Sequence, residues 1–324
     1  MLKPFICTTF INQIRIKLKE KRKNMSSAVL KLSKPEIQKL KNYYTDYLLT
    51  KRVPYSEFSA KKNGISITAY TSGKVLFQGN NADQEAARWG NPGAASPKKS
   101  NTLPKNFDSL SVLGSDEVGN GSYFGPLCVC AAYADKEHLK ALKQLGVKDS
   151  KMLTDEQIRK MAEEIKGMIP SRLLVVQPEK YNEIQPKYNA VRMKVALHNQ
   201  AIRLLLEEIA PTKPDAILID QFTSEANYMK YVAQEPKRVQ EKIYFVTKGE
   251  QYHLSVAAAS IISRASFLDE LGQASQELGM KVPSGAGKPS DELAAKLLQK
   301  GGIDLLRKYV KLHFANTEKA KKMI

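Results

Sequence analysis

Residues 109–324 alternate short apolar runs with longer amphipathic segments, and this alternation restricts the fold more than any other feature of the chain. Apolar runs of about four to eight residues are typical of strands, and apolar residues at helical spacing are typical of helices. The predicted strands are Val112–Val118, Pro126–Tyr133, Leu173–Val176, Ala216–Ile219 and Ile243–Val246. The predicted helices cover residues 136–145, 154–168, 190–209, 224–232 and 254–278. Such an alternation favours an α/β domain with a mixed sheet flanked by helices.

A smaller α+β domain is predicted before it, at residues 25–90. Its predicted elements are a strand at Ala28–Leu32, a helix at Pro35–Leu49, a hairpin of Ile65–Tyr70 and Lys74–Gln78, and a helix at Asp83–Trp89. Lys61, Lys62, Lys74 and Tyr70 could form a basic face on this sheet. Ordinary solvated lysines explain the same residues, so this pattern alone does not establish a binding face.

Two segments lie outside the predicted domains. Residues 91–108 are rich in Gly, Pro, Ser and Lys and lack an apolar period, which indicates a linker before a domain at 109–324. Residues 1–24 hold a short apolar patch and a basic run without a cleavage site, so they do not resemble a signal peptide. We expect this extension to be disordered or not translated, with Met25 as the true start.

The charge balance points to a polyanionic partner. The formal net charge is +18, from 51 Lys and Arg against 33 Asp and Glu. Such a field attracts nucleic acid by counterion release, although many proteins carry basic charge for solubility only. Nucleic acid is therefore the first partner to consider, and a more specific signal is needed.

Cysteine content and hydropathy indicate a cytoplasmic protein that does not associate with a membrane. Cys7, Cys128 and Cys130 form no paired framework, and no apolar stretch is long enough to span a bilayer. Cys128 and Cys130 are two residues apart on a predicted strand, without a histidine at ligand spacing. We interpret them as small buried side chains and not as a metal site.

Acidic residues occur where buried strands should carry none. Asp116 and Glu117 follow each other on a strand that is apolar up to Leu113, and unpaired buried carboxylates are costly. Asp220 ends a second apolar strand, and Glu250 follows a third. Because open sheets place functional groups at strand ends, the four acids are expected to converge.

Converging carboxylates would suit divalent cations. Two such ions about 3.5–4 Å apart can stabilise the attacking and leaving oxygens of phosphoryl transfer. Ligation by oxygen alone favours Mg²⁺ or Mn²⁺ over zinc. Each acid taken singly is more readily explained as a helix cap or a surface turn, and Asp149 is a competing acid. The adjacent pair Asp116 and Glu117 is harder to explain in that way.

Glycines surround this acidic pair, at positions 114, 119, 121 and 125. This density lets a backbone approach a ligand closely, and turn amides can hold phosphate or ribose oxygens. No Gly-Lys-Ser/Thr follows, and Pro126 with a strand comes next where a dinucleotide-binding motif would have a helix. Nucleotide-cofactor binding is therefore disfavoured.

Several segments together resemble the prokaryotic type 2 ribonucleases H, and among these ribonuclease HIII. The segments are GSDEVGNGSYFGP at 114–126, KDSK at 148–151, LIDQF at 218–222, KGE at 248–250, SVAAASIISR at 255–264 and KLHFANT at 311–317. Two features favour ribonuclease HIII over ribonuclease HII. One is the N-terminal α+β domain, which is similar to the TATA-box-binding-protein-like domain of that family, and the other is Glu250, where ribonuclease HII typically has Asp. The resemblance covers residues 25–324.

The resemblance implies a ribonuclease H-like fold and a catalytic mechanism. Asp116, Glu117, Asp220 and Glu250 would be the catalytic acids that bind two Mg²⁺ or Mn²⁺ ions, with Asp116 bridging them. One ion would activate a water and the other would stabilise the leaving 3′ oxygen. The RNA strand of an RNA/DNA hybrid would then be cut to give 3′-hydroxyl and 5′-phosphate ends.

The resemblance also implies substrate contacts, in a protein that we expect to be a monomer. Gly119, Asn120 and Gly121 would face the RNA strand, with Asn120 where ribonuclease HII has Arg. The remaining expected contacts are Lys148, Ser150 and Lys151, and Tyr70 and Lys74 on the N-terminal sheet. Two alternatives remain open: cleavage at single ribonucleotides embedded in DNA, and a non-catalytic nucleic-acid-binding protein.

Overall fold

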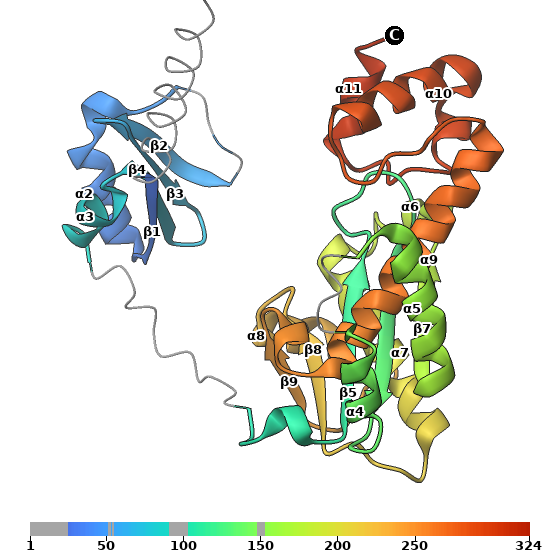
Figure 1. The fold of residues 1–324 in the computed structure, drawn as a ribbon. Coiled ribbons are helices and arrows are strands. Elements are labelled where there is room, and N and C mark those ends of the chain that lie inside the picture. Colours follow the sequence, from blue (N-terminus) through green and yellow to red (C-terminus); the bar gives the residue numbers. More distant parts are fainter. Residues whose placement is uncertain (1–24, 51–52, 54, 91–102, 148–152) are drawn as a thin grey trace, which may run out of the picture. The chain divides into compact units, whose positions relative to one another are not determined.

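The computed structural model describes residues 25–50, 53, 55–90, 103–147 and 153–324 (Figure 1). These residues form two compact units that divide near residue 100, and each unit is described by itself. No helix within the described residues is long and apolar enough to cross a membrane. The predicted extension 1–24 and most of the predicted linker lie outside the described residues, so the predicted domain boundaries remain predictions.

The N-terminal unit is a four-stranded antiparallel sheet with helices on one face (Figure 1). Its elements are β1 (Met25–Lys31), α2 (Lys34–Tyr43), the 3₁₀ helix η1 (Thr45–Tyr47), β2 (Ser56–Lys62), β3 (Ile65–Tyr70), β4 (Lys74–Asn80) and α3 (Ala82–Ala87). The strand order is β1-β4-β3-β2. Alternate strand residues such as Ile67, Ala69 and Phe77 pack with Ile37 and Leu40 of α2 in one core. The opposite face of the sheet is left to solvent.

Two expectations for this unit were wrong in detail. The predicted helix Pro35–Leu49 ends at Tyr43, because Tyr44 turns into the core and is fully buried. Leu48 then leaves the helical path and forms an isolated bridge with Ala60. Strand β2 was not predicted, since its burial does not alternate along the sequence SEFSAKK and polar residues occupy both ends.

The C-terminal unit contains a five-stranded mixed sheet, in the order β7-β6-β5-β8-β9. The strands are β5 (Val112–Val118), β6 (Leu127–Ala134), β7 (Ser171–Val176), β8 (Ala216–Asp220) and β9 (Ile243–Val246). Strands β5, β6 and β7 pair antiparallel, whereas β5, β8 and β9 pair parallel. The fold class predicted from the sequence, a mixed sheet flanked by helices after a small α+β unit, is confirmed.

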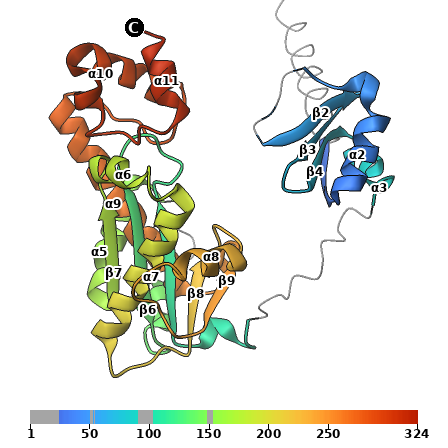
Figure 2. The same cartoon turned by 180° about the vertical axis from the view of Figure 1, so that it is seen from behind.

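Helices cover both faces of this sheet (Figures 1 and 2). The helices are α4 (Leu139–Gln144), α5 (Asp155–Met168), α6 (Pro178–Ile184), α7 (Ala190–Ile209), α8 (Glu225–Val232), α9 (Leu254–Leu278), α10 (Lys288–Leu306) and α11 (Ala315–Lys321), with the 3₁₀ helices η2 (Phe107–Ser109) and η4 (Gly249–Gln251). Helices α9 and α5 pack on one face, and α7 with α8 packs on the other. Figure 2, which views the molecule from behind, shows the face of the sheet that α7 covers.

Helix α9 packs unusually close to β5. A Cβ atom on Gly114 would overlap the backbone nitrogen of Val256, so only glycine fits at this position of the strand. The facing turn of α9 carries the small buried residues Ala257, Ala258 and Ala259. This close approach places the middle of α9 directly beside the acidic end of β5.

The C-terminal helices extend the molecule beyond one end of the sheet (Figure 1). Leu293 and Leu297 of α10 and Val310 pack with Tyr123 and Phe124, in a cluster separate from the core under α5. Helices α6, α10 and α11 were not predicted. The predicted burial of Cys128 and Cys130 is correct, because both side chains are fully buried on β6 as free thiols.

His253 caps α9 from a buried position and should make folding sensitive to acid. Its Nε2 lies 3.1 Å from the carbonyl oxygen of Leu110, and its Nδ1 accepts a hydrogen bond from the amide of Ser255 at 3.1 Å. Burial lowers the pKa of His253 from 6.5 to about 4. The unfolded chain therefore binds a proton between these values while the folded chain does not, so stability falls as the pH falls.

As the pH falls from 6.5 to 4, we expect the burial of this histidine to lower the free energy of unfolding by about 3 kcal/mol. Urea unfolding of wild type and of His253→Gln across this range measures the effect. The variant should be less stable at pH 7 but should lose less stability on acidification. His138→Gln, at a histidine whose side chain is 40% exposed, is the control. Equal pH slopes for wild type and His253→Gln would contradict the assignment.

Candidate active site

The structure brings the four predicted acids to one cavity of about 280 Å³. Asp116 and Glu117 lie near the end of β5, Asp220 is the last residue of β8, and Glu250 lies in η4 after β9. Because β5 and β8 run parallel with Ser115 opposite Ile219, Asp116 and Asp220 occupy neighbouring positions at one edge of the sheet. The strand topology therefore accounts for the convergence of these acids.

Asp116 faces α9 in a setting that disfavours its charge. Burial raises the pKa of its carboxyl to about 7, and the nearby carboxylates of Glu117 and Asp220 act in the same direction. A hydrogen bond from Ser260 on α9 opposes these effects only in part. Burial and the two neighbouring carboxylates both disfavour the ionised form of Asp116, and a bound cation would favour it.

Asp220 and Glu250 are joined through the backbone of η4. The amide of Gly249 donates to Oδ1 of Asp220 at 2.8 Å. Lys248 precedes it in the left-handed conformation, with φ of 61°. This turn directs Glu250 to the same cavity as Asp220. Burial raises the pKa of Asp220, and the charge of Glu250 adds to this effect.

Consecutive strand residues face opposite sides of a sheet, so Glu117 contacts α7 whereas Asp116 faces α9, and the carboxylate of Glu117 still lines the acid cavity. Lys194 Nζ donates to its Oε1 at 2.7 Å, and His198 Nε2 lies 3.0 Å from its Oε2. His198 Nδ1 lies 2.7 Å from the hydroxyl of Ser115, and its ring stacks on Phe222. Burial alone would raise the pKa of Glu117, but the contacts with His198 and Lys194 outweigh it and lower the pKa.

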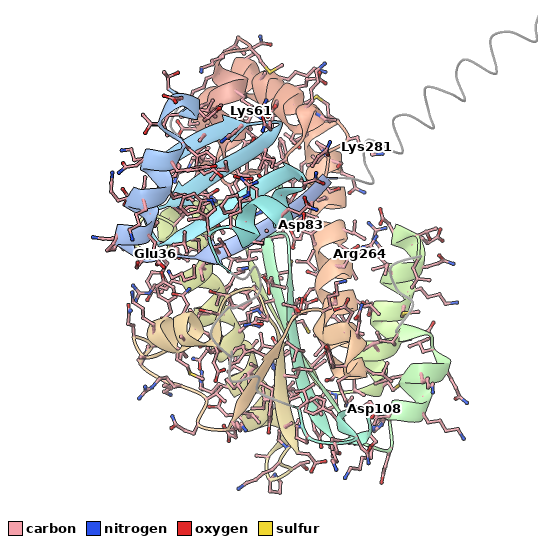
Figure 3. The ribbon with its side chains drawn as sticks, turned by 90° about the vertical axis from the view of Figure 1, so that its left-hand side faces the viewer. Glu36, Lys61, Asp83, Asp108, Arg264 and Lys281 are labelled. Carbon is pink, nitrogen blue, oxygen red and sulfur yellow. The ribbon has the colours of Figure 1, made fainter. Side chains whose placement is uncertain are left out.

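The sequence analysis missed these partners of the acids. Lys194 and His198 are both buried on α7, and their i, i+4 spacing places two polar residues on its inner face. That interruption of an apolar face was the available signal. Ser260 and Arg264 of α9 also line the acid cavity, and Figure 3 labels Arg264. Arg264 donates to Asp155 of α5 at 3.3 Å.

The residues present fit a hard divalent cation. All four acids offer carboxylate oxygens, the ligands that Mg²⁺ and Mn²⁺ prefer. Burial first, and the neighbouring carboxylates of Glu117 and Asp220 second, raise the pKa of Asp116, and a bound cation would favour its ionised form. Within the described residues, however, no three acid, histidine or cysteine side chains form a closed metal-binding cluster.

The glycine turn after β5 presents backbone amides beside the acids. Gly119 has φ of 94°, and a Cβ atom there would overlap the carbonyl oxygen of Pro126. Asn120 and Gly121 are exposed. Among the described residues, the amides of Asn120 and Gly121 find no hydrogen-bond acceptor. They are therefore available to a ligand.

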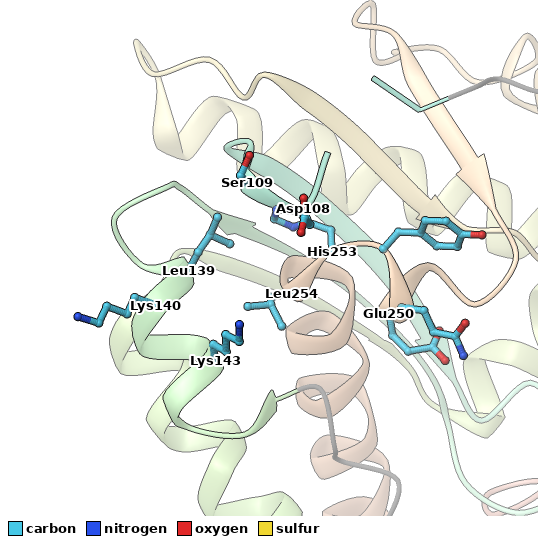
Figure 4. A pocket seen from close by; sticks show the side chains of 10 residues that line it. Asp108, Ser109, Leu139, Lys140, Lys143, Glu250, His253 and Leu254 are labelled. Atoms are coloured by element: carbon cyan, nitrogen blue, oxygen red, sulfur yellow. The ribbon is translucent and has the colours of Figure 1, made fainter. Parts of the chain in front are cut away.

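A second cavity, of about 350 Å³, adjoins the acid cavity through Glu250, which lines both. Figure 4 shows Lys140 and Lys143 of α4 at one side of it, Glu250 at the other, and Leu254 between them. The two lysines lie on the side of this cavity away from Glu250, and Asp108 also lines it.

The other predicted contact residues are not placed at this site by the structure. Lys148, Ser150 and Lys151, with the competing acid Asp149, lie outside the described residues. Tyr70 and Lys74 belong to the N-terminal unit, at the end of β3 and the start of β4. Their role in binding substrate therefore stays a prediction.

Comparison with known proteins identifies the family of this chain. The family model described as "Ribonuclease HII" matches residues 113–317, and one described as a domain of unknown function matches residues 27–102. The chain is 60% identical over 300 residues to ribonuclease HIII of Enterococcus faecalis, covering 91% of this chain and 98% of the relative. This chain belongs to the ribonuclease HIII family. Ribonuclease HIII of Listeria monocytogenes is 46% identical over 306 residues, covering 93% of this chain and 99% of the relative.

Solved structures of ribonuclease HIII share the fold. The crystal structure of Bst-RNase HIII in complex with Mn²⁺ has a TM-score of 0.66 and 40% identity, covering 92% of this chain and 99% of that one. Aquifex aeolicus RNase H3 gives a TM-score of 0.52 at 25% identity, with 88% and 98% of the chains covered. The expectations of a ribonuclease H-like fold and of a metal-dependent hydrolase are confirmed, and divalent-metal use follows from the family and its Mn²⁺-bound member.

Proposed function

We propose that this ribonuclease HIII cuts the RNA strand of RNA/DNA hybrids through Asp116, Glu117, Asp220 and Glu250. The observation that carries the proposal is a single cavity lined by these four acids. The turn with the exposed amides of Asn120 and Gly121 follows directly on the same strand. Acids that hold cations and amides that face a sugar-phosphate backbone are the two parts that such a cleavage requires.

We infer that the four acids hold two divalent cations, Mg²⁺ or Mn²⁺. When bound, two such ions supply an activated water and neutralise charge on the leaving 3′ oxygen, which yields 3′-hydroxyl and 5′-phosphate ends. Asp116 lines the cavity beside Glu117 and Asp220 and accepts a hydrogen bond from Ser260 of α9. Lys194 and His198 orient Glu117, and Gly249 orients Asp220 through its amide.

Recognition of RNA is assigned to the glycine turn. The 2′-hydroxyl distinguishes RNA from DNA, and it can both donate and accept a hydrogen bond. The amides of Asn120 and Gly121 could reach a 2′-hydroxyl or a phosphate oxygen, and Gly119 permits this close approach. Arg264 at the cavity, together with Lys148, Ser150 and Lys151, would contact the backbone of the hybrid.

The open face of the N-terminal sheet is proposed as a second contact with the hybrid. Lys31 and Lys74 are cross-strand partners on it, and both are exposed. Tyr70 ends the adjacent strand β3, while Lys61, labelled in Figure 3, projects from β2. The rest of this face carries the polar residues Ser27, Ser66, Thr68 and Gln78 and the apolar cross-strand pair Val29 and Leu76. The positive charge of its lysines suits the sugar-phosphate backbone of a duplex.

Lys74→Ala tests this second contact. We expect KM for a hybrid to rise about 3-fold with kcat unchanged, and the salt dependence of binding to weaken by about one counterion. Binding of a fluorescent hybrid at several salt concentrations measures both effects. Lys39→Ala, at an exposed lysine of α2 on the covered side of the sheet, is the matched control. Equal salt slopes for Lys74→Ala and Lys39→Ala would remove Lys74 from the binding surface.

The proposed activity is tested with three labelled duplexes: an RNA/DNA hybrid, a DNA duplex with one ribonucleotide, and an all-DNA duplex. With Mg²⁺ or Mn²⁺, we expect rapid cleavage of the hybrid and none of DNA. The similarity to ribonuclease HIII does not favour the single-ribonucleotide alternative, and Asn120 adds no cation at the turn. No hybrid cleavage with either ion would refute the proposal. We also infer that the protein is cytoplasmic and monomeric. Sedimentation of the protein with and without hybrid would check the oligomeric state.

A further inference from the structure

Lys311 is a buried lysine without a carboxylate partner. Its side chain is fully buried after α10, and it makes no ion pair with any residue that the structure describes. Its Nζ donates to the carbonyl oxygen of Ser122 at 3.0 Å and to that of Gly125, and lies 5.7 Å from the ring centroid of Tyr181. Burial lowers the pKa of this amine to about 7. Burying an amine without a carboxylate partner costs free energy of folding, so we expect Lys311 to have a function that offsets this cost.

Both acceptors belong to the glycine-rich segment that continues from Gly119 to Pro126. This segment leaves β5 at Val118 and reaches β6 only at Leu127, so the sheet does not hold its backbone. Residues that follow α9 in the sequence hold this backbone instead, through hydrogen bonds. The amide of Lys311 donates to the carbonyl oxygen of Tyr123 at 2.9 Å, and the amide of Gly125 donates to that of Tyr309 at 3.0 Å.

A second set of hydrogen bonds holds the start of the segment Gly119–Pro126. The amide of Tyr123 donates to the carbonyl oxygen of Gly285 at 3.0 Å, and the amide of Gly285 donates to the hydroxyl of Ser122 at 2.9 Å. The amide of Ser122 in turn donates to the carbonyl oxygen of Gly119 at 3.1 Å, which closes the turn. The amine of Lys311 donates to both Ser122 and Gly125 and so links the two ends of this stretch of the segment.

The charge of Lys311 also matters, because the segment Gly119–Pro126 contains no Lys or Arg. A cation in a low-dielectric interior acts over a longer distance than one at the surface. When protonated, the amine of Lys311 adds positive potential on the buried side of the turn that carries the exposed residues Asn120 and Gly121. The charge of Lys311 and the turn amides would both favour the binding of phosphate oxygens at the exposed side of the turn.

We propose that Lys311 is a positioning residue that fixes the Gly119–Gly121 turn for the RNA strand and places a positive charge behind it. The proposal rests on the proposed function of that turn. It gives the C-terminal segment a task in substrate binding, although Lys311 itself touches no substrate. Loss of the ammonium should loosen the turn amides and weaken binding, while the acids that carry out the cleavage keep their partners.

The test compares Lys311→Met with wild type and with Lys308→Met, an exposed lysine of the same region. Methionine has a similar length and is at home in an apolar pocket. For Lys311→Met we expect KM for the hybrid to rise about 10-fold with kcat within about 3-fold, and the preference for binding hybrid over DNA duplex to fall by a similar factor. Lys308→Met should match wild type.

Thermal unfolding of each variant shows whether it is folded, and if Lys311→Met is not, Lys311→Gln carries the same comparison. Lys311→Arg, which keeps a charged donor, should recover at least part of the lost affinity. A folded variant with wild-type KM, or one that loses kcat alone, would overturn the inference. Failure of the proposed function would appear in the wild-type protein, as absent hybrid cleavage, and is thereby distinguishable.

Discussion

Replacement of Asp116 by Asn is expected to lower kcat by about 10³-fold or more while the protein stays folded, a loss equivalent to about 4 kcal/mol of transition-state stabilisation. The substitution keeps the shape of the side chain and removes its charge. That charge lies in the acid cavity, beside Glu117 and Asp220, where it would attract divalent cations. Steady-state cleavage of an RNA/DNA hybrid with Mg²⁺ and with Mn²⁺ measures the loss.

Metal binding provides a readout that does not depend on activity. A ligand that binds only the folded state raises the unfolding midpoint, so Mn²⁺ should stabilise the wild type and have a smaller effect on Asp116→Asn. Asp269→Asn, at a 61% exposed acid of α9 paired with Arg159, is the matched control and should behave as wild type in both assays. A non-catalytic nucleic-acid-binding protein would show no change in either assay, and that result would exclude the acid site.

The acids at the strand ends were predictable because each interrupts an apolar run. Asp116 follows a buried stretch of β5, and Asp220 is the first acid after four buried residues of β8. Parallel pairing of these strands brings their carboxyl ends to one edge, a rule that needs only the order of the elements. The structure brings the four predicted acids to one cavity for that reason. The comparison of Asp116→Asn with wild type tests the predicted role of these acids as metal ligands.

The partners of the acids were not predictable in the same way. Lys194 lies 77 residues after Glu117, on a helix where a lysine reads as a solvent-exposed residue. Only the packing of α7 on the sheet turns it inward, with 5% of its side chain exposed. Lys311 is a similar case, since a lysine in a C-terminal segment carries no signal of burial. The only local signal for Lys194 was its i, i+4 spacing with His198 on the inner face of α7, and the burial of both lysines depends on which elements pack together.

The missed elements have local physical reasons. Helix α10 contains Gly301 and Gly302 in non-helical conformations, which interrupt the apolar spacing that predicts a helix. Helix α11 has only 7 residues, too few for a clear period. Helix α7, with 20 residues and a sustained apolar face, was predicted with its observed bounds. Regular apolar spacing, more than length, therefore decided which helices could be predicted, since the short helices α3 and α4 were predicted as well.

The buried pair of Glu117 and Lys194 is expected to produce the largest effect on stability. Their side chains are 10% and 5% exposed, and Nζ lies 2.7 Å from Oε1. Lys194→Met leaves Glu117 with His198 as its remaining partner and also removes the cation above the ring of Phe222. Because removal of one member of a buried pair leaves the other uncompensated, we expect a loss of about 3–5 kcal/mol in the free energy of unfolding.

The double variant Glu117→Gln/Lys194→Met shows whether the loss of stability comes from the interaction between the two side chains. Glu117→Gln alone should also destabilise the protein, since it leaves the charge of Lys194 buried without a carboxylate. Combined with Lys194→Met, it should restore part of the stability, because neither charge then remains unpaired in the interior. Urea unfolding of the four proteins in metal-free buffer gives the coupling energy. Lys180→Met, at an exposed lysine paired with Glu183, should cost less than about 1 kcal/mol. Strictly additive losses would show that Lys194 stabilises the fold through packing and not through its charge on Glu117.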